Sequence, residues 1–189
     1  MKRIEVLGVV DKINYLTPPS HIVLVSTISK DGVPNVAPFG MFMIASSKPP
    51  MVAVGISPKS DTFKNIVDTG EFVVGIPQVK HLDKVYKAGD KVEPNVNEFL
   101  YAKLTPYSSV NVKPYRIDEC CANIECIMNW KKESGNHYII CGNVVGADII
   151  ENVFINAKNN IDLRTSLDTA YHITGSYFSI GVKTIKDVK

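Results

Sequence analysis

The sequence predicts a mainly β protein, a β-barrel of antiparallel strands with a few short helices. Short segments rich in β-branched residues recur between turn residues, and four of them fit into residues 21–56. Strands so closely spaced favour antiparallel pairing over alternating βαβ units. No Gly-x-Gly-x-x-Gly motif follows a predicted strand, which argues against a doubly wound nucleotide-binding fold. A barrel closes its edges and can hold a ligand at its mouth or between subunits.

The size and composition of the chain fit one globular domain. With 189 residues and a mass of 20.8 kDa, the chain is long enough to bury ~70% of its unfolded surface without disulfides or a metal. Hydrophobic residues make up 45% and charged residues 21%, which argues against both a disordered chain and a membrane protein. We therefore predict a single domain over residues 1–189.

Charge and hydropathy limit the partners and the location. Basic and acidic residues, 21 and 19 in number, are mixed along the chain for a net charge of +2, so we expect no nucleic-acid partner. No run of about eighteen apolar residues occurs, and the apolar segment at residues 4–10 is too short for a signal peptide. We expect no membrane partner and a cytoplasmic location.

The first four strands are predicted by apolar runs and by the turns between them. Residues 21–28 (HIVLVSTI) lead into Ser29-Lys30-Asp31-Gly32, which contains an Asp-Gly turn typical of hairpins. The return strand is expected at residues 33–39. Further strands are expected at 41–46 and 51–56, separated by the Ser-Lys-Pro-Pro turn.

Two short helices and a strand are predicted next. Residues 60–70 place apolar residues at helical spacing after several N-cap residues, and Gly70 suits a left-handed helix end. Residues 71–76 (EFVVGI) return to a strand that Pro77 ends. Apolar residues at helical spacing predict a second helix within 79–89.

The middle of the chain is predicted to leave the sheet and then return to it. Residues 90–119 are broken by prolines and form an excursion, with a short helix near 96–103. Residues 121–129 and 137–147 are two longer strand candidates. We expect the polar segment 131–136 between them to be a hairpin loop.

The C-terminal part is less regular. Residues 156–169 are polar and have no assigned element, whereas residues 171–180 are typical of a final strand, broken by Gly175. Neither an internal repeat nor a low-complexity tract occurs, which excludes repeat architectures.

The cysteines predict neither a disulfide framework nor a metal site. Cys120, Cys121, Cys126 and Cys141 form no C-x-x-C pair and no cluster with histidines at zinc-finger spacing. Reduced structural thiols are the interpretation we adopt. Because Cys120 and Cys121 are adjacent, they should point to opposite faces of a strand, and only one of them should be in the core.

The order and spacing of the motifs resemble the flavin reductase-like FMN-binding split-barrel family, which includes flavoredoxin. The resemblance covers nearly the whole chain, although no single motif is diagnostic. The segments that carry it are Lys30-Asp31-Gly32, Pro34-Asn35-Val36-Ala37-Pro38, Ser46-Ser47-Lys48-Pro49-Pro50, Lys59-Ser60-Asp61-Thr62-Phe63-Lys64-Asn65-Ile66, Thr69-Gly70-Glu71-Phe72-Val73-Val74, Ala122-Asn123-Ile124-Glu125-Cys126, residues 137–145 and residues 171–177.

The resemblance implies a homodimer of Greek-key split barrels that holds FMN non-covalently at the dimer interface. Either NAD(P)H or a redox partner protein would reduce the FMN. The residues implied for the flavin ring are Asn35, Ala37, Pro38, Phe39, Ser46 and Ser47. Those implied for the phosphate are Ser57, Lys59, Ser60, Thr62 and Asn65. His172 stands where the family often has an arginine, so its role stays open.

The residue types fit these two roles chemically. A phosphate dianion needs hydroxyls, backbone N–H groups and a cation, and the start of a helix at Lys59, Ser60 and Thr62 offers all three. Asp61 carries the wrong charge and is assigned to capping. The alternative interpretation is that this segment only caps a surface helix, and that the Ser-Ser-Lys-Pro-Pro segment is a plain turn.

The flavin ring needs an apolar slot and N–H donors, which the strand backbone of residues 37–39 can supply, except at Pro38. Hydride transfer to a flavin requires no nucleophile, so the lack of a catalytic triad is no objection. His21 and His81 are interpreted as structural, whereas His137 and His172 are kept as site candidates. Trp130 is expected to pack rather than to stack on the flavin.

Two function classes therefore stay open. The first is an FMN-dependent oxidoreductase, either an NAD(P)H:flavin reductase or a flavoredoxin-like electron carrier. In a reductase, the excursion at residues 90–119 is where space for the nicotinamide is expected. The second is a non-enzymatic binding protein for flavin, haem or another planar ligand, since a fold alone does not decide function.

Overall fold

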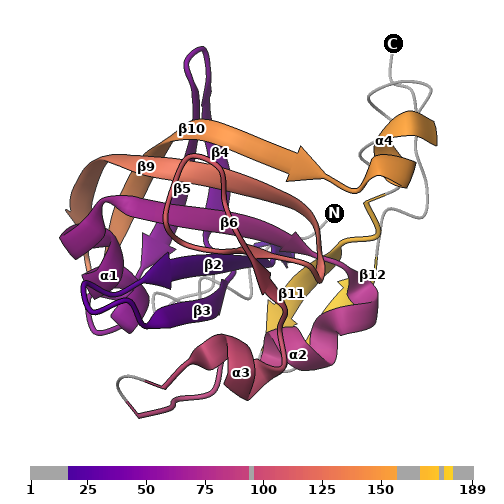
Figure 1. The fold of residues 1–189 in the computed structure, drawn as a ribbon, viewed down its shortest axis with the longest axis horizontal. Coiled ribbons are helices and arrows are strands. Elements are labelled where there is room, and N and C mark those ends of the chain that lie inside the picture. The colour runs from indigo at the N-terminus through magenta and orange to yellow at the C-terminus, as the bar shows by residue number, and fades with distance from the viewer. Residues whose placement is uncertain (1–16, 94–95, 157–166, 175–176, 181–189) are drawn as a thin grey trace, which may run out of the picture.

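A seven-stranded antiparallel sheet forms the body of the protein (Figure 1). The computed structural model describes residues 17–93, 96–156, 167–174 and 177–180. Because both ends of the chain lie outside these ranges, the single domain over 1–189 stays a prediction. The strands, in their order across the sheet, are β3 (Pro34–Phe39), β2 (Val23–Ile28), β6 (Glu71–Pro77), β9 (Cys120–Ser134), β10 (His137–Ile149), β5 (Pro50–Ile56) and β4 (Phe42–Ser47).

The sheet curls into a split barrel. Its two edge strands, β3 and β4, follow each other in the chain through Gly40 and Met41, but no β-ladder joins them. The Gly55 N–H of β5 donates to the Met41 carbonyl at 2.8 Å and so extends the pairing of β4 with β5 by one residue. The chain leaves β5 and enters β6 on the far side of β10 and β9, as in Greek-key connections. This arrangement confirms the mainly β barrel with short helices.

Short helices and two small sheets surround the barrel. Figure 1 shows α2 (Leu82–Lys87) and α3 (Glu98–Ala102) beside β3, and α1 (Asp61–Thr69) at one end of the barrel. The remaining elements are η2, a 3₁₀ turn (Val79–His81), α4 (Glu151–Asn156), a two-stranded sheet of β7 (Pro106–Tyr107) and β8 (Arg116–Ile117), and a three-stranded sheet of β1 (Ser20–His21), β11 (Ala170–Thr174) and β12 (Tyr177–Ile180).

Strand β2 is buried on both faces because it separates two hydrophobic cores. Val23 and Val25 face the barrel interior, where they join a cluster that includes Phe72. Leu24 faces the other way, into a second cluster under α2 and α3 that includes Phe99. Coverage on both sides explains why residues 21–28 read as a continuous apolar run rather than an alternating one.

Helix α1 begins and ends where the sequence predicts. The Ser60 hydroxyl accepts a hydrogen bond from the Phe63 N–H at 3.1 Å, and so caps the helix. Gly70 adopts a left-handed conformation with φ of 76°, and its N–H donates to the Ile66 carbonyl. Asp61 is an exposed first-turn residue rather than the cap, so the capping role assigned to it belongs to Ser60.

Two hairpins differ from the predicted elements. Strands β9 and β10 pair as far as Ser134 and His137, so the loop expected over residues 131–136 shrinks to two residues. Gly135, with φ of 62°, permits this tight turn, and the exposed polar residues before it continue the ladder. Residues 171–180 form not one broken strand but the antiparallel pair β11 and β12. The unassigned segment 156–169 lies largely outside the described ranges.

The prediction that only one of two adjacent cysteines is in the core is wrong. Cys120 packs into the core under α2 and α3, and Cys121 is also buried, with its Sγ donating to the Ile76 carbonyl. Both faces of β9 are covered at this point, so alternation along the strand leaves neither thiol exposed. Burial raises the pKa of Cys121 to about 11, which makes it an unreactive thiol at neutral pH.

A buried hydroxyl on β2 gives a test of these packing assignments. Within the described ranges, Ser26 Oγ is buried and has no hydrogen-bond partner, whereas its neighbour Thr27 Oγ1 both donates and accepts a hydrogen bond. We expect Ser26→Ala to raise the thermal midpoint by about 2 °C, because it removes an unsatisfied polar group. Thr27→Ala should lower the midpoint by at least as much. A fall in the midpoint for Ser26→Ala would contradict the assignment.

Candidate functional site

The side chain of Asn35 lies at the centre of a buried hydrogen-bond network. Its Oδ1 accepts from Thr27 Oγ1 of β2 at 2.9 Å and from Thr62 Oγ1 of α1 at 3.0 Å. Asn65 of α1 donates to Thr27 at 3.1 Å. We call these four residues, together with Glu98, the Asn35 network. The network brings Asn35, which was predicted to contact the flavin ring, next to Thr62 and Asn65, which were predicted to contact the phosphate. These side chains bond to one another rather than facing the surface.

Glu98 of α3 completes the network, and nothing in the sequence pointed to it. Its Oε2 accepts from Asn35 Nδ2 at 2.7 Å and from the Val36 N–H at 2.9 Å. Burial raises the pKa of Glu98 to about 7, and the negative field of Asp61 acts in the same direction, against the opposing effect of the Val36 N–H. The carboxyl group can therefore change its charge near neutral pH.

A groove runs along the exposed side of the first turns of α1. We call this hollow of about 320 Å³ the α1 groove. Lys59 and Lys64 stand exposed along it, and the Ser60 hydroxyl lies between them in the chain. Asp61 and Asp68 also line the groove, and Asp68 is paired with Lys30 at 3.2 Å. Two lysines at a helix start suit an anionic phosphate, whereas the Ser60 hydroxyl is engaged with the Ser57 carbonyl and the Phe63 N–H. Lys64 is a groove residue that was not among the predicted phosphate residues.

A second hollow lies between β3 and α2. This pocket of about 270 Å³, the β3–α2 pocket, has mixed apolar and polar walls, with Tyr86, Asp90 and His172 as its ionisable groups. It brings Pro38 and His172 together, two predicted residues that are far apart in the sequence. The lining residues are Ile22, Pro38, Gly40, Val85, Tyr86, Gly89, Asp90 and His172. Apolar side chains beside a few polar groups fit part of a planar ring.

Gly40 permits the close approach of β3 to the small three-stranded sheet at this pocket. A Cβ atom on Gly40 would stand 3.0 Å from Ser20 Oγ and 3.7 Å from His172 Nδ1. The first contact is tight, so the Ser20 side chain would have to give by a few tenths of an ångström to admit a Cβ here, whereas the second is an ordinary van der Waals contact.

The remaining predicted residues lie apart from these hollows. Ala37 pairs with Val25, and Phe39 packs against the barrel interior. Ser46 and Ser47 end β4, in a hairpin that projects from the body at the top of Figure 1. The whole length of β5, ~20 Å at 3.3 Å per residue, separates them from Ser57. One chain alone therefore does not bring the Ser-Ser turn to the predicted phosphate residues.

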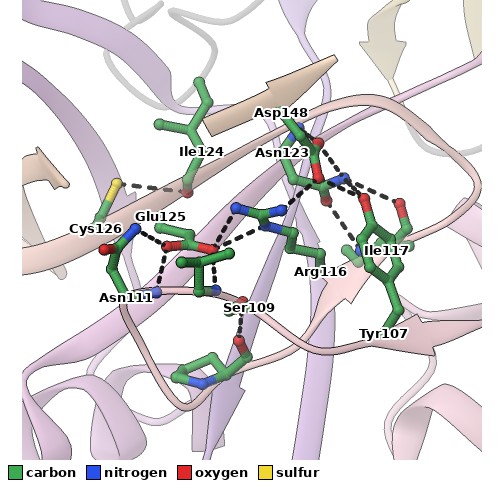
Figure 2. Close-up of polar contacts among 12 residues, drawn as sticks. Tyr107, Ser109, Asn111, Arg116, Ile117, Asn123, Ile124, Glu125, Cys126 and Asp148 are labelled. Carbon is green, nitrogen blue, oxygen red and sulfur yellow. Dashed lines mark hydrogen bonds and ion pairs between the residues drawn. The ribbon is translucent and has the colours of Figure 1, made fainter. Parts of the chain in front are cut away.

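Buried ion pairs anchor the excursion that was expected to make space for nicotinamide (Figure 2). Glu125 of β9 accepts from the backbone N–H groups of Val110 and Asn111, at 2.7 and 2.8 Å, and from Arg116 Nη2 at 2.7 Å. Arg116 also pairs with Asp148 at 3.0 Å. Burial would raise the pKa of Glu125, but these donors outweigh it and hold the pKa below its ordinary value.

The other candidate side chains lie outside both hollows. His21 stacks on Tyr171 with ring centroids 5.1 Å apart, and His137 contacts the Asn136 side chain at 2.7 Å. Burial and the neighbouring Lys80 lower the pKa of His81. Trp130 on β9 is 44% exposed. Within the described ranges no group of His, Cys, Asp and Glu is arranged to hold a metal ion, and no helix there has the length and apolarity to cross a membrane.

The topology and the two hollows define a split-barrel protein with room for a ligand beside β3. Residues 16–181 match the family described as "Flavin reductase like domain". Since this match covers most of the chain, the protein belongs to the flavin reductase-like family. The family expected from the order of the motifs is thereby confirmed, and so is the split-barrel fold.

The chain is similar to an uncharacterised protein of Aquifex aeolicus, with 41% identity over 116 residues. That alignment covers 59% of each chain, so it spans less than two thirds of the relative. Among solved structures, nitrilotriacetate monooxygenase component B from Bacillus cereus has a TM-score of 0.85 and 25% identity, and the match covers 98% of both chains.

Two further solved structures show the same fold at lower identity. Flavoredoxin of Desulfovibrio vulgaris (Miyazaki F) has a TM-score of 0.82 and 21% identity, covering 98% of this chain and 97% of that one. An FMN-binding protein from Thermus thermophilus, solved with bound p-hydroxybenzaldehyde, has a TM-score of 0.81 and 16% identity over 100% of both chains. These likenesses show the fold alone.

Proposed function

We propose that this protein is an FMN-binding oxidoreductase that passes electrons through its flavin. The proposal rests on a structural observation in a chain of the flavin reductase-like family. Two hollows lie near opposite ends of β3, the α1 groove and the β3–α2 pocket. At one end of β3, Asn35 bonds to α1, whose first turns line a groove with two lysines. Toward the other end, Pro38 lines the β3–α2 pocket.

The residues present fit the two ends of FMN. Lys59 and Lys64 would neutralise the phosphate. The Ser60 hydroxyl already donates to the Ser57 carbonyl at 2.9 Å, so its part is to cap α1 beside the phosphate. Residues 37–39 and the β3–α2 pocket would receive the ring and exclude water from one of its faces. The N–H groups of Ala37 and Phe39 point toward β2, because that of Val36 points away from it to Glu98. When bound, FMN supplies the redox chemistry itself. FMN is chosen over other flavins because the α1 groove suits a terminal phosphate, and a similar fold in Thermus thermophilus belongs to an FMN-binding protein.

The proposal has two forms, which differ in the electron donor of the flavin. An NAD(P)H:flavin reductase needs room for a nicotinamide over the flavin, whereas a flavoredoxin-like carrier takes electrons from a redox partner protein. Flavoredoxin shares the fold, and the family is that of flavin reductases. A non-enzymatic binding protein for flavin, haem or another planar ligand is the alternative class.

Anaerobic mixing of the FMN-loaded protein with NADH or NADPH tests the activity. We expect the visible absorption of the flavin to bleach within seconds, because hydride transfer needs only a nicotinamide held against the flavin. Loaded protein that stays yellow with both nicotinamides, but bleaches with a reduced electron-transfer protein, is a carrier. Protein that no reductant bleaches would contradict the oxidoreductase proposal.

Lys59→Ala tests the phosphate site. Losing one cation beside the phosphate should weaken FMN binding about tenfold, whereas the affinity for riboflavin, which has no phosphate, should not change. Lys131→Ala is the matched control, because Lys131 is an exposed lysine on β9. Titration of protein fluorescence or flavin absorbance measures both affinities. Equal losses for FMN and riboflavin would rule out the phosphate assignment.

We also propose that the protein is a homodimer and that the dimer completes the flavin site. Edge strand β4 and the residue before it expose large apolar side chains, with Met41 54%, Met43 56% and Ile44 71% exposed. Such an edge needs cover to avoid aggregation, and its hairpin projects from the body (Figure 1). A second copy seated there would cover these side chains and carry its own Ser46 and Ser47 toward a neighbouring site.

Ile44→Glu tests the dimer. A charge placed in an apolar interface should dissociate it, so the mass from light scattering should fall from about 42 kDa to the 20.8 kDa of one chain. Val110→Glu serves as the control, because Val110 is 77% exposed on the excursion. If Ile44→Glu keeps the mass of the unmodified protein, the interface does not include β4. FMN affinity should fall together with the mass.

A further inference from the structure

We propose that Glu98 is a positioning residue for the flavin, and that its protonation state sets how firmly β3 is held for binding. The inference rests on the proposed function, because it concerns the same strand. Glu98 does not line either hollow. Instead, it acts through Asn35 and the backbone of β3.

The geometry makes Glu98 the outer support of an edge strand. β3 pairs with β2 on one side only, since it ends the order of the seven-stranded sheet. The Val36 N–H donates to Glu98 Oε2 at 2.9 Å instead of to a further strand. The next residues along β3 are Ala37 and Pro38, which are predicted to contact the ring. A weaker bond at Val36 would therefore loosen the strand directly beside the ring.

A second contact couples the same carboxylate to the phosphate end. Asn35 donates to Glu98 Oε2 at 2.7 Å while it accepts from Thr62 of α1 at 3.0 Å. Helix α1 also lines the groove that contains Lys59. Glu98 is thus coupled to both predicted ends of the cofactor site through one carboxylate. A carboxylate that only accepted from the edge of β3 would have no such connection to α1.

The charged state of Glu98 makes these bonds strong. Hydrogen bonds to a carboxylate are about twice as strong as those to a neutral acceptor. Asp61 of α1 is the acidic group whose field acts on Glu98. Two more charged groups, on and after α2, are engaged with Tyr101 of α3. Lys87 Nζ lies 4.9 Å from the centroid of the Tyr101 ring, and Asp90 accepts a hydrogen bond from the Tyr101 hydroxyl. With the pKa of Glu98 at about 7, its charge is gained between about pH 6 and 8.

Flavin affinity measured against pH tests the inference. We expect the dissociation constants of both FMN and riboflavin to fall about fivefold between pH 5.5 and 8.5, as Glu98 loses its proton and holds β3 more firmly. Riboflavin is included because it lacks the phosphate, which titrates in the same range. Glu98→Gln should bind riboflavin equally at both pH values, and Glu93→Gln, which alters an exposed carboxylate of the same excursion, should behave like the unmodified protein.

The outcomes separate the inference from the proposed function. If the unmodified protein binds neither flavin, both fail. If it binds riboflavin with the same affinity at both pH values, or if Glu98→Gln keeps the pH dependence, only the inference is overturned. Should Glu98→Gln fail to fold, Asp61→Asn decides. Removing that negative field should move the midpoint of the pH dependence to lower pH, and an unchanged midpoint overturns the inference.

Discussion

The side-chain amide of Asn35 joins four elements, the neighbouring strands β2 and β3 and the more distant helices α1 and α3. Its oxygen accepts hydrogen bonds from β2 and from α1, and its nitrogen donates to Glu98 on α3. Since Asn35 itself belongs to β3, the edge strand of the barrel, one buried amide fixes how both helices sit against that strand. A buried polar group without partners costs about 1–3 kcal/mol, so each of these contacts is needed once Asn35 is inside. The α1 groove and the β3–α2 pocket take their relative positions from this constraint.

The barrel supports this arrangement by burying β2 on both faces. Val25 faces the barrel interior, while Leu24 packs under α2 and α3, so the strand next to β3 is held from both sides. The buried carboxylate of Glu125 has its partners, since Arg116 and two backbone N–H groups satisfy it. Ser26 Oγ on β2 is a buried polar group without one. At the other edge of the sheet, β4 leaves the apolar side chains of Met43 and Ile44 exposed.

Elements whose ends are fixed by residues close together in the chain could be predicted from the sequence. Ser60 and Gly70 define α1 because a cap and a left-handed glycine act within a few residues, and the family resemblance depended on such segments in order. Contacts between distant segments could not be predicted in this way. The partnership of Asn35 with Glu98 spans 63 residues, and the burial of both Cys120 and Cys121 requires covers on the two faces of β9 that the strand's own sequence does not reveal. The turn at Gly135 was missed because the exposed polar residues before it suggested a loop.

The proposed function depends most directly on the binding of FMN beside β3. The visible absorption spectrum of the purified protein, followed by identification of the released cofactor, measures this directly. We expect flavin bands in the visible and one FMN released per chain, with added FMN raising the thermal midpoint of any cofactor-free fraction. A colourless protein whose midpoint FMN leaves unchanged would contradict it.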